Sequence, residues 1–306
     1  MSQSNSFDSA WKEIFDVYFK QFVGLCWEEK YSEIDWEKGY KMLDKELIKI
    51  ARNAPSKNRV IDKLIQVYRK NGEEAWVLIH LEVQGSYDSD FEERMFIYRY
   101  RLHDLYRKPV ASVAVLIDNN LGWRPSTYRV ELWDTYIETR FFTIKLSDYR
   151  NRIPELEAST NPFASVILAQ LSAMEKQEPV ERLISKLELT KRLYKQGLGK
   201  DYILNLYKFI DWIMALPPEL DLQYHQVIEQ MEEELEMAYI TTAERIGIQK
   251  GRLEGQSALT LRLVERRFGD VPEIYRVKIQ KAALESLLEW CSRLQSAETV
   301  EAVFEE

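Results

Sequence analysis

Apolar residues recur with helical spacing at the start of the chain. The spacing predicts a helix over residues 7–27, which we expect Asp8 to cap. Its buried stripe should consist of Trp11, Ile14, Phe15, Tyr18, Phe19 and Phe22. Residues 41–51 predict a second, short helix.

Strand-like runs follow at residues 59–68 and 75–84, separated by Lys70-Asn71-Gly72. Ser89 and Glu92 match a capping box, which predicts a helix that stops at Lys108, before Pro109. The apolar stripe of this helix is Phe91, Met95, Tyr98, Leu102 and Leu105. Further strands are expected at residues 110–117, 128–134 and 139–146.

From Asn161-Pro162 onward the pattern is almost entirely helical, with helices predicted at 163–175, 179–196, 200–215 and 218–250. Gly247, Gly251 and Gly255 recur every fourth residue in a polar stretch. We favour a semi-flexible linker there, because each glycine weakens a helix by about 1 kcal/mol relative to alanine. The alternative is a small-residue stripe for close helix pairing, a motif best known from apolar membrane helices.

Residues 256–306 predict a compact helical appendage, in which a helix ends at Gly269 and two more helices follow. The expected organisation is therefore an α/β core with a mixed sheet over residues 7–150, a helical extension and connector over 151–250, and a small helical domain over 256–306.

Polar residues interrupt one face of the strand Leu78-Ile79-His80-Leu81-Glu82-Val83-Gln84. His80, Glu82 and Gln84 share that face because strand side chains alternate. The preceding strand carries one acid, Asp62, among aliphatic residues. Whether Asp62 and Glu82 meet depends on the intervening turn. A two-residue Asn71-Gly72 turn would put them on opposite faces.

A three-residue loop, Lys70-Asn71-Gly72, has the opposite consequence. With Gly72 left-handed in a bulge, Arg69 pairs with Glu73, and Asp62 lies opposite His80 and diagonal to Glu82. The two carboxylates would then repel each other without a cation between them. Oxygen ligands with free water positions suit Mg²⁺ or Mn²⁺ better than zinc.

The roles of the neighbouring polar residues stay open at this level. Gln84 can orient a water or a phosphate oxygen through its amide. His80 could ligate, accept a proton, or hydrogen-bond at the edge of the core, and we favour the structural role. The alternative for the acids is that each lies at a strand end where the strand emerges into solvent.

Composition narrows the class of protein. The net charge is −8, with most of the acidity after residue 150, so a tightly DNA-binding basic protein is disfavoured. No apolar run is long enough to cross a bilayer, and the first residues lack the features of a signal peptide. Two cysteines without ligand spacing and three scattered histidines disfavour a disulfide framework and a zinc site. A cytoplasmic location is expected.

Several segments in register resemble one known family. They are Leu43-Asp44-Lys45-Glu46-Leu47, Val60-Ile61-Asp62-Lys63-Leu64, His80-Leu81-Glu82-Val83-Gln84, the run from Phe91 to Tyr98, Asn161-Pro162-Phe163-Ala164 and Phe209-Ile210-Asp211-Trp212. Over roughly residues 7–250 the chain resembles the Rpn-like recombination-promoting nuclease and transposase family of the PD-(D/E)XK superfamily. Residues 256–306 resemble a small helical domain of unknown function that often follows such proteins.

The resemblance implies an α/β core whose mixed sheet carries catalytic acids between flanking helices. Asp62 matches the Asp of the motif and Glu82 the (D/E), whereas Gln84 stands where lysine is usual. That departure removes a cation near the attacking water and leaves more of the activation to the metal. The superfamily often adds an acid from the first helix, for which Asp8 and Glu13 are candidates.

Asp16 is a further first-helix candidate. Arg94 and Arg101 lie seven residues apart on the predicted helix that follows the site, where they could reach a phosphate. Lys63 should point away from Asp62 across the strand, which disfavours a direct catalytic role.

The leading hypothesis is a Mg²⁺- or Mn²⁺-dependent DNA endonuclease that cleaves a phosphodiester by attack of metal-bound water, linked to recombination or transposition. Asp62 and Glu82 would hold the metal, with Gln84 positioning water or phosphate. The alternative is a nonenzymatic interaction or assembly protein on a degenerate nuclease fold, oligomerising through its helical half. An RNA-directed nuclease is not distinguished from a DNA-directed one by sequence.

Overall fold

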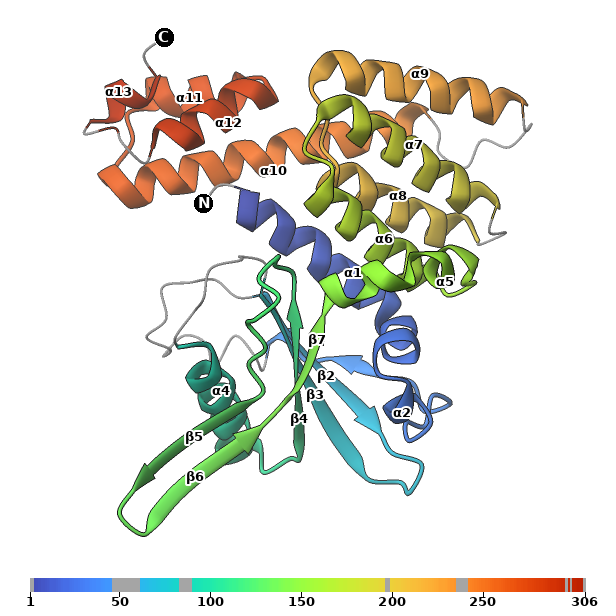
Figure 1. Cartoon of the computed structure of the whole chain (residues 1–306). Coiled ribbons are helices and arrows are strands. Elements are labelled where there is room, and N and C mark those ends of the chain that lie inside the picture. The colour runs from blue at the N-terminus through green and yellow to red at the C-terminus, as the bar shows by residue number, and fades with distance from the viewer. Residues whose placement is uncertain are drawn as a thin grey trace. The chain divides into compact units, whose positions relative to one another are not determined.

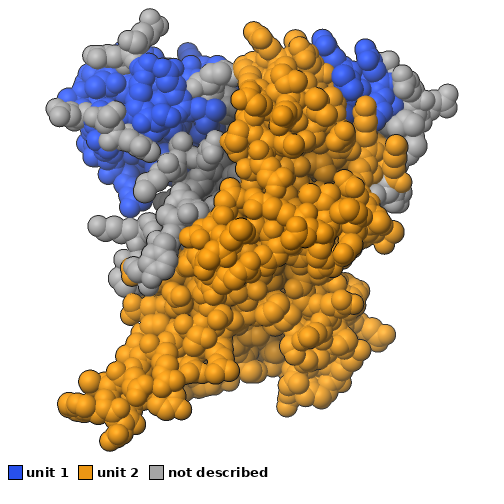
Figure 2. All heavy atoms as spheres, viewed as in Figure 1, with its two compact units in different colours: residues 1–10, 225–306 blue, residues 11–224 orange. Residues whose placement is uncertain are grey.

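The apolar runs near residues 60–80 and 110–117 form neighbouring strands of one sheet in a computed structural model of the chain (Figure 1). The structure describes residues 3–45, 61–82, 90–195, 199–234, 242–294, 297 and 299–304. Within these ranges only the backbone is described at 3–9, 61–62, 80–82, 233–234, 242–246, 248–250, 252 and 284–285. The chain forms two compact units (Figure 2): the first unit is residues 11–224, drawn in orange (unit 2 of the key), and the second unit is residues 1–10 with 225–306, drawn in blue (unit 1 of the key).

The sheet of the first unit has the order β1-β2-β3-β4-β7. Its strands are β1 (Lys41–Met42), β2 (Ile61–Tyr68), β3 (Glu74–Glu82), β4 (Val110–Leu116) and β7 (Phe142–Lys145). β1, β2 and β3 pair antiparallel, whereas β3, β4 and β7 pair parallel. The N-terminal part is therefore an α/β fold with a mixed five-strand sheet, as the sequence predicts at this level.

One face of the sheet is covered by α4 (Phe91–Tyr106) (Figure 1). Tyr98 and Leu102 of α4 form a buried cluster with Leu64 of β2 and Leu78 of β3, together with other apolar residues. The predicted capping box is wrong, because α4 begins after Asp90 and so Glu92 is its second residue. The helix ends at Tyr106, two residues earlier than predicted, since Arg107 adopts a left-handed conformation (φ 52°) ahead of Pro109.

The predicted stripe of the first helix is confirmed in α1 (Gln3–Cys26), where all six apolar residues are buried. Trp11 packs edge-on against Phe209 of α8 (Lys200–Ile213) with ring centroids 5.2 Å apart, and Phe22 packs against Phe163 of α6 (Pro162–Glu175). The expectation that Asp8 caps this helix is wrong, because α1 begins at Gln3 and Asp8 lies within it.

Two further predictions about elements need correction. Residues 41–51 do not form one helix, because Lys41 and Met42 pair with Gln66 and Ile65 of β2; residues 46–51 lie outside the described part. The strand predicted at 139–146 is divided between two sheets. β6 (Thr135–Arg140) pairs with β5 (Thr127–Leu132), and β7 joins the main sheet.

The rest of the first unit is mostly helical, as predicted. It comprises α2 (Glu28–Tyr31), the 3-10 helix η1 (Leu146–Arg152), α5 (Ile153–Ala158), α6, α7 (Pro179–Lys195), α8 and the start of α9 (Pro218–Glu234). α6 follows Asn161, whose side-chain oxygen accepts a hydrogen bond from Phe163 N at 2.9 Å and so caps the helix.

The second unit contains the rest of α9, α10 (Thr242–Phe268), α11 (Glu273–Lys281), α12 (Leu284–Arg293) and α13 (Val300–Phe304). Gly247, Gly251 and Gly255 all lie inside α10, so the prediction of a semi-flexible linker is wrong. A Cβ at Gly247 or Gly251 would meet no atom within 4 Å, so neither glycine marks close helix pairing. The predicted helix end at Gly269 is confirmed, with φ 84° there. No described helix is long and apolar enough to span a membrane.

Candidate functional site

The turn between β2 and β3 decides where the candidate acids lie. Arg69 N donates to Glu73 O at 2.7 Å, Gly72 N donates to Arg69 O at 2.8 Å, and Gly72 has a left-handed φ of 89°. Asp62 is therefore paired with His80 in the antiparallel register. The three-residue loop predicted from the sequence is confirmed, and the register that would separate the two acids is absent.

The register also identifies the face on which these positions lie. Asp62 shares its face with Leu64, while His80 and Glu82 share theirs with Leu78, because side chains alternate along a strand. Leu64 and Leu78 pair with each other and are buried against α4. Asp62, His80 and Glu82 are thus positions on the α4 side of two adjacent strands. Their side chains lie outside the described set, and so does the whole of Gln84.

The first turns of α4 pack on β4 beside the positions of His80 and Glu82. Ala114 and Leu116 of β4 pair with His80 and Glu82 in the parallel register. Both form a buried cluster with Phe91 and Met95 of α4. A ligand bound by Asp62 and Glu82 would therefore lie where α4 begins, at the end of β3.

Arg94 lies on this turn of α4, and Arg101 two turns further on. The guanidinium of Arg94 is 5.6 Å from the Phe91 ring centroid, and the residue is only 8% exposed. Arg101 is half-buried, next to Leu102. A buried arginine is held by partners for its charge. Of the two predicted phosphate contacts, Arg94 lies nearer the level of Asp62 and Glu82, because it is next to Met95, which packs on Ala114 and Leu116.

Of the three candidate acids in the first helix, Glu13 and Asp16 have described side chains, whereas that of Asp8 lies outside the described set. Glu13 is exposed, and Asp16 contacts Lys63, whose Nζ lies 2.6 Å from Asp16 Oδ1 and 2.9 Å from Asp44 Oδ2. The Lys63 side chain is 4% exposed and follows Asp62 in β2, so it lies on the opposite face of the sheet. The prediction that Lys63 points away from Asp62 agrees with these contacts. Asp16 is therefore committed to the face that does not carry Asp62 and Glu82.

A second charged arrangement, which the sequence did not reveal, lies at the ends of the parallel strands. Lys145 Nζ donates to both carboxylate oxygens of Asp118, at 2.6 and 2.7 Å, to Asn120 O at 2.7 Å and to Trp123 O at 3.1 Å. Both charged side chains are almost completely buried. Because the ammonium is surrounded by acceptors, Lys145 fixes the loop after β4 and is not a free acid or base.

The loop is tied from outside as well. Arg124 makes a bidentate contact with Asp148, with nitrogen–oxygen distances of 2.7 and 2.5 Å. Hydrogen bonding from Arg124 lowers the pKa of the Asp148 carboxyl. Both groups are about half exposed, so this pair is a surface clamp of modest energy.

A third buried cation joins three helices in the helical part of the first unit. Lys186 Nζ of α7 lies 2.7 Å from Asp211 Oδ1 of α8 and 3.4 Å from Asp221 Oδ1 of α9. It also lies 4.3 Å from the ring centroid of Tyr224, whose pKa is raised by burial. The Tyr224 hydroxyl is 2.8 Å from Thr190 Oγ1. These satisfied contacts align α7, α8 and α9.

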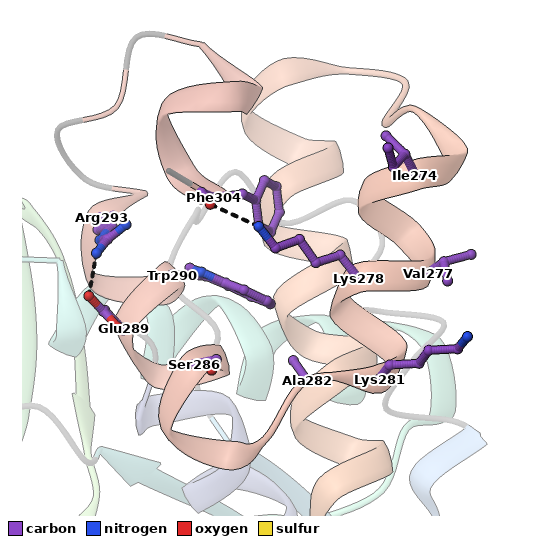
Figure 3. A pocket seen from close by; sticks show the side chains of 10 residues that line it. All are labelled: Ile274, Val277, Lys278, Lys281, Ala282, Ser286, Glu289, Trp290, Arg293 and Phe304. Carbon is purple, nitrogen blue, oxygen red and sulfur yellow. Dashed lines mark hydrogen bonds and ion pairs between the residues drawn. The ribbon is translucent and has the colours of Figure 1, made fainter. Parts of the chain in front are cut away.

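The second unit has a hollow of about 640 Å³ lined from α11, α12 and α13 (Figure 3). Lys278 crosses it, donating to Phe304 O at 2.9 Å and lying 5.6 Å from the Trp290 ring centroid. Arg293, paired with Glu289, lies on the other side of the hollow. Trp290 and Phe304 give the hollow an aromatic floor, and Lys278, Lys281 and Arg293 contribute basic groups to its lining beside Glu289.

Both cysteines are buried and free, and burial raises the pKa of the Cys26 thiol to about 12. Neither is a reactive thiolate at neutral pH. Among the described side chains, the buried cysteines and the paired lysines Lys145 and Lys186 offer no free nucleophile or base. The candidate acids at positions 62 and 82 lie on the α4 side of β2 and β3. No family model, curated protein or solved structure matches the chain.

Proposed function

We propose that the protein is a metal-dependent DNA endonuclease of the PD-(D/E)XK type. The observation that carries the proposal is the hairpin register, which pairs Asp62 with His80 and sets Glu82 diagonally across on the same face. Diagonal neighbours of this kind lie within reach of one shared ligand. Two carboxylates so placed repel each other unless a cation lies between them.

The donor set fits Mg²⁺ or Mn²⁺. Carboxylate oxygens with water completing the coordination shell are the ligands that these hard cations prefer. When bound, such an ion supplies Lewis-acid stabilisation of phosphoryl oxygens and lowers the pKa of coordinated water.

The chain's own residues have separate parts in this proposal. Asp62 and Glu82 hold the cation, and the Gln84 amide orients water or a phosphate oxygen without moving a proton. Arg94 attracts the anionic backbone of the substrate to the start of α4. Because Gln84 replaces the usual lysine, no side-chain cation is assigned beside the attacking water.

The arrangement of elements supports the same superfamily. Its core has a mixed sheet between helices, and here α4 covers the face of Asp62 and Glu82 while Asp16 of α1 contacts the other face through Lys63. The strands that carry the acids are an antiparallel pair, and β3 is joined by a parallel strand. These features match what the resemblance implies for residues 7–150.

Cleavage of supercoiled plasmid by the purified full-length chain tests the proposal. We expect nicking with Mg²⁺ or Mn²⁺, none with chelator, and loss of at least about 100-fold in rate for Asp62→Asn and Glu82→Gln. Glu74→Gln is the matched control, since Glu74 lies on the same strand but at its other end, bound to Lys108 at 2.7 Å. A folded wild type that cleaves neither DNA nor RNA with any divalent ion would overturn the proposal. Cleavage of RNA alone would overturn the assignment of DNA as the substrate.

A second candidate function is that of a nonenzymatic interaction protein. The hollow in the second unit favours it, because its aromatic and basic side chains offer a binding surface. Under this alternative the Asp62→Asn and Glu82→Gln variants would behave like the wild type in every assay.

A further inference from the structure

The β5–β6 hairpin extends from the body of its unit as a two-stranded arm (Figures 1 and 2). We call residues 127–140 the arm. Its large apolar side chains are exposed, including Leu132 at 64% and Trp133 in the turn at 86%. A two-stranded hairpin is marginally stable in water by itself. Exposed apolar surface concentrated on one element marks an interaction site.

The arm has a mainly apolar face and a face that carries its strand charges together with Tyr136, which pairs with Glu131. Directly paired residues share a face, so Val130 with Ile137 and Leu132 with Thr135 lie on the apolar side. Near the body this side is covered by Phe96 of α4, which stacks on Tyr128 at 5.0 Å. The other side carries Arg129, which lies 2.7 Å from Glu131 on the same strand.

The outer edge of β5 is open. Phe141 N donates to Ser126 O at 2.9 Å, so Ser126 and Phe141 form a hydrogen-bonded pair of the antiparallel ladder. Hydrogen-bonded pairs alternate, so Tyr128, Val130 and Leu132 bond to β6, whereas Arg129 and Glu131 direct their backbone groups outward. No other strand in the described part of the chain pairs with this edge. Such an edge is a template for another strand.

We propose that a second copy of this chain pairs its own β5 with this edge across a two-fold axis. Outward residues must pair with outward residues, which leaves few registers. One sets Arg129 against Arg129 and another sets Glu131 against Glu131, and both oppose like charges. The register centred on Val130 sets Arg129 against Glu131 of the second copy, twice by symmetry.

The same register matches the apolar face. Tyr128 comes opposite Leu132 of the second copy, and Val130 lies opposite its own counterpart at the axis. Aromatic, aliphatic and opposite-charge cross-strand pairs all stabilise such a ladder. The two arms then form one four-stranded sheet with a continuous apolar face.

The other edge and another class of partner fit less well. If β6 paired with its own counterpart, the register that sets Glu138 against Arg140 would centre on Thr139. Thr139 is only 7% exposed, so it is already buried within its own chain. A nucleic acid is disfavoured, because the arm has two arginines, three acidic residues and no lysine.

Disulfide trapping tests the axis. Val130 and its counterpart form a non-hydrogen-bonded pair, in which Cα atoms lie about 4.5 Å apart, within the range that a disulfide spans. Oxidised Val130→Cys should run as a disulfide-linked dimer, whereas Ile137→Cys, on the same face but the other strand, should not. The native Cys26 and Cys291 are buried and should stay reduced. No dimer with Val130→Cys, or equal dimer with both variants, would overturn the proposal.

Charge exchange tests the register without relying on one variant's folding. Arg129→Glu and Glu131→Arg should each weaken the dimer at least about tenfold in sedimentation equilibrium. An equimolar mixture of the two variants should associate again, because each supplies the charge that the other opposes, and the double variant should also associate. A wild type that stays monomeric at about 100 μM, or a mixture no tighter than its components, would contradict the proposal.

Discussion

At the scale of single residues, the structure shows how two buried lysines are paired. Lys145 and Lys186 are buried with carboxylates and further acceptors around them. A buried charge is costly unless it is paired and hydrogen-bonded, so such groups hold elements in place. The side chains of Asp62 and Glu82, the two acids proposed to bind metal, lie outside the described set.

Lys145→Met tests the buried ion pair between Lys145 and Asp118, which holds the loop after β4. The substitution leaves Asp118 buried without its cation, and we expect a loss of about 3–5 kcal/mol in the free energy of unfolding. Lys108→Met is the matched control, since Lys108 forms a half-exposed pair with Glu74 and should cost about 1 kcal/mol or less. Denaturant unfolding of the full-length chain measures both. Equal losses in the free energy of unfolding for the two variants would show that the Lys145–Asp118 pair does not hold the loop in place.

The two kinds of charged residue differ in how far sequence reveals them. Alternation along a strand was enough to place Asp62 and Glu82 on one face once the loop length was known. The pairing of Lys145 with Asp118 depends on the parallel alignment of β4 with β7, which no local pattern encodes. Asp16 likewise became a partner of Lys63 only through the packing of α1 on the sheet.

At the scale of elements, strongly periodic segments were predicted well and short or shared ones were not. The α1 stripe, the β2–β3 hairpin and helices α6 to α8 follow from apolar period and turn residues. Lys41–Met42 forms a strand because β2 offers an edge, and residues 135–145 divide because two sheets compete for them. The glycines of α10 remain helical because the sequence around them continues the helix on both sides.

Two glycine substitutions should change the stability of the chain in opposite directions. Gly72→Ala places a Cβ at φ 89° and should destabilise the chain by about 1–2 kcal/mol. Gly247→Ala adds a Cβ in open space within α10 and should stabilise it by about 0.5–1 kcal/mol. Thermal unfolding of both variants checks the pair. A stabilising Gly72→Ala would mean that the loop does not adopt the bulged turn on which the site depends.

At the scale of the whole molecule, the fold class was predictable because an alternating strand-and-helix region precedes an almost purely helical one. The division of the chain into compact units was harder to predict from the sequence. Helices α5 to α8 belong to the same compact unit as the sheet, since the aromatic side chains of α1 pack on α6 and α8. The sheet and these helices therefore belong to one compact unit.

The central claim is that Asp62 and Glu82 bind one divalent cation together. Mn²⁺ binding to the full-length protein, followed by electron paramagnetic resonance, tests it without requiring cleavage. We expect Asp62→Asn and Glu82→Gln each to weaken binding more than about tenfold, and the double variant to lose less than the sum of the two effects. Glu74→Gln should bind Mn²⁺ like the wild type. Mn²⁺ binding that both single variants retain, or no binding by the folded wild type, would contradict the claim.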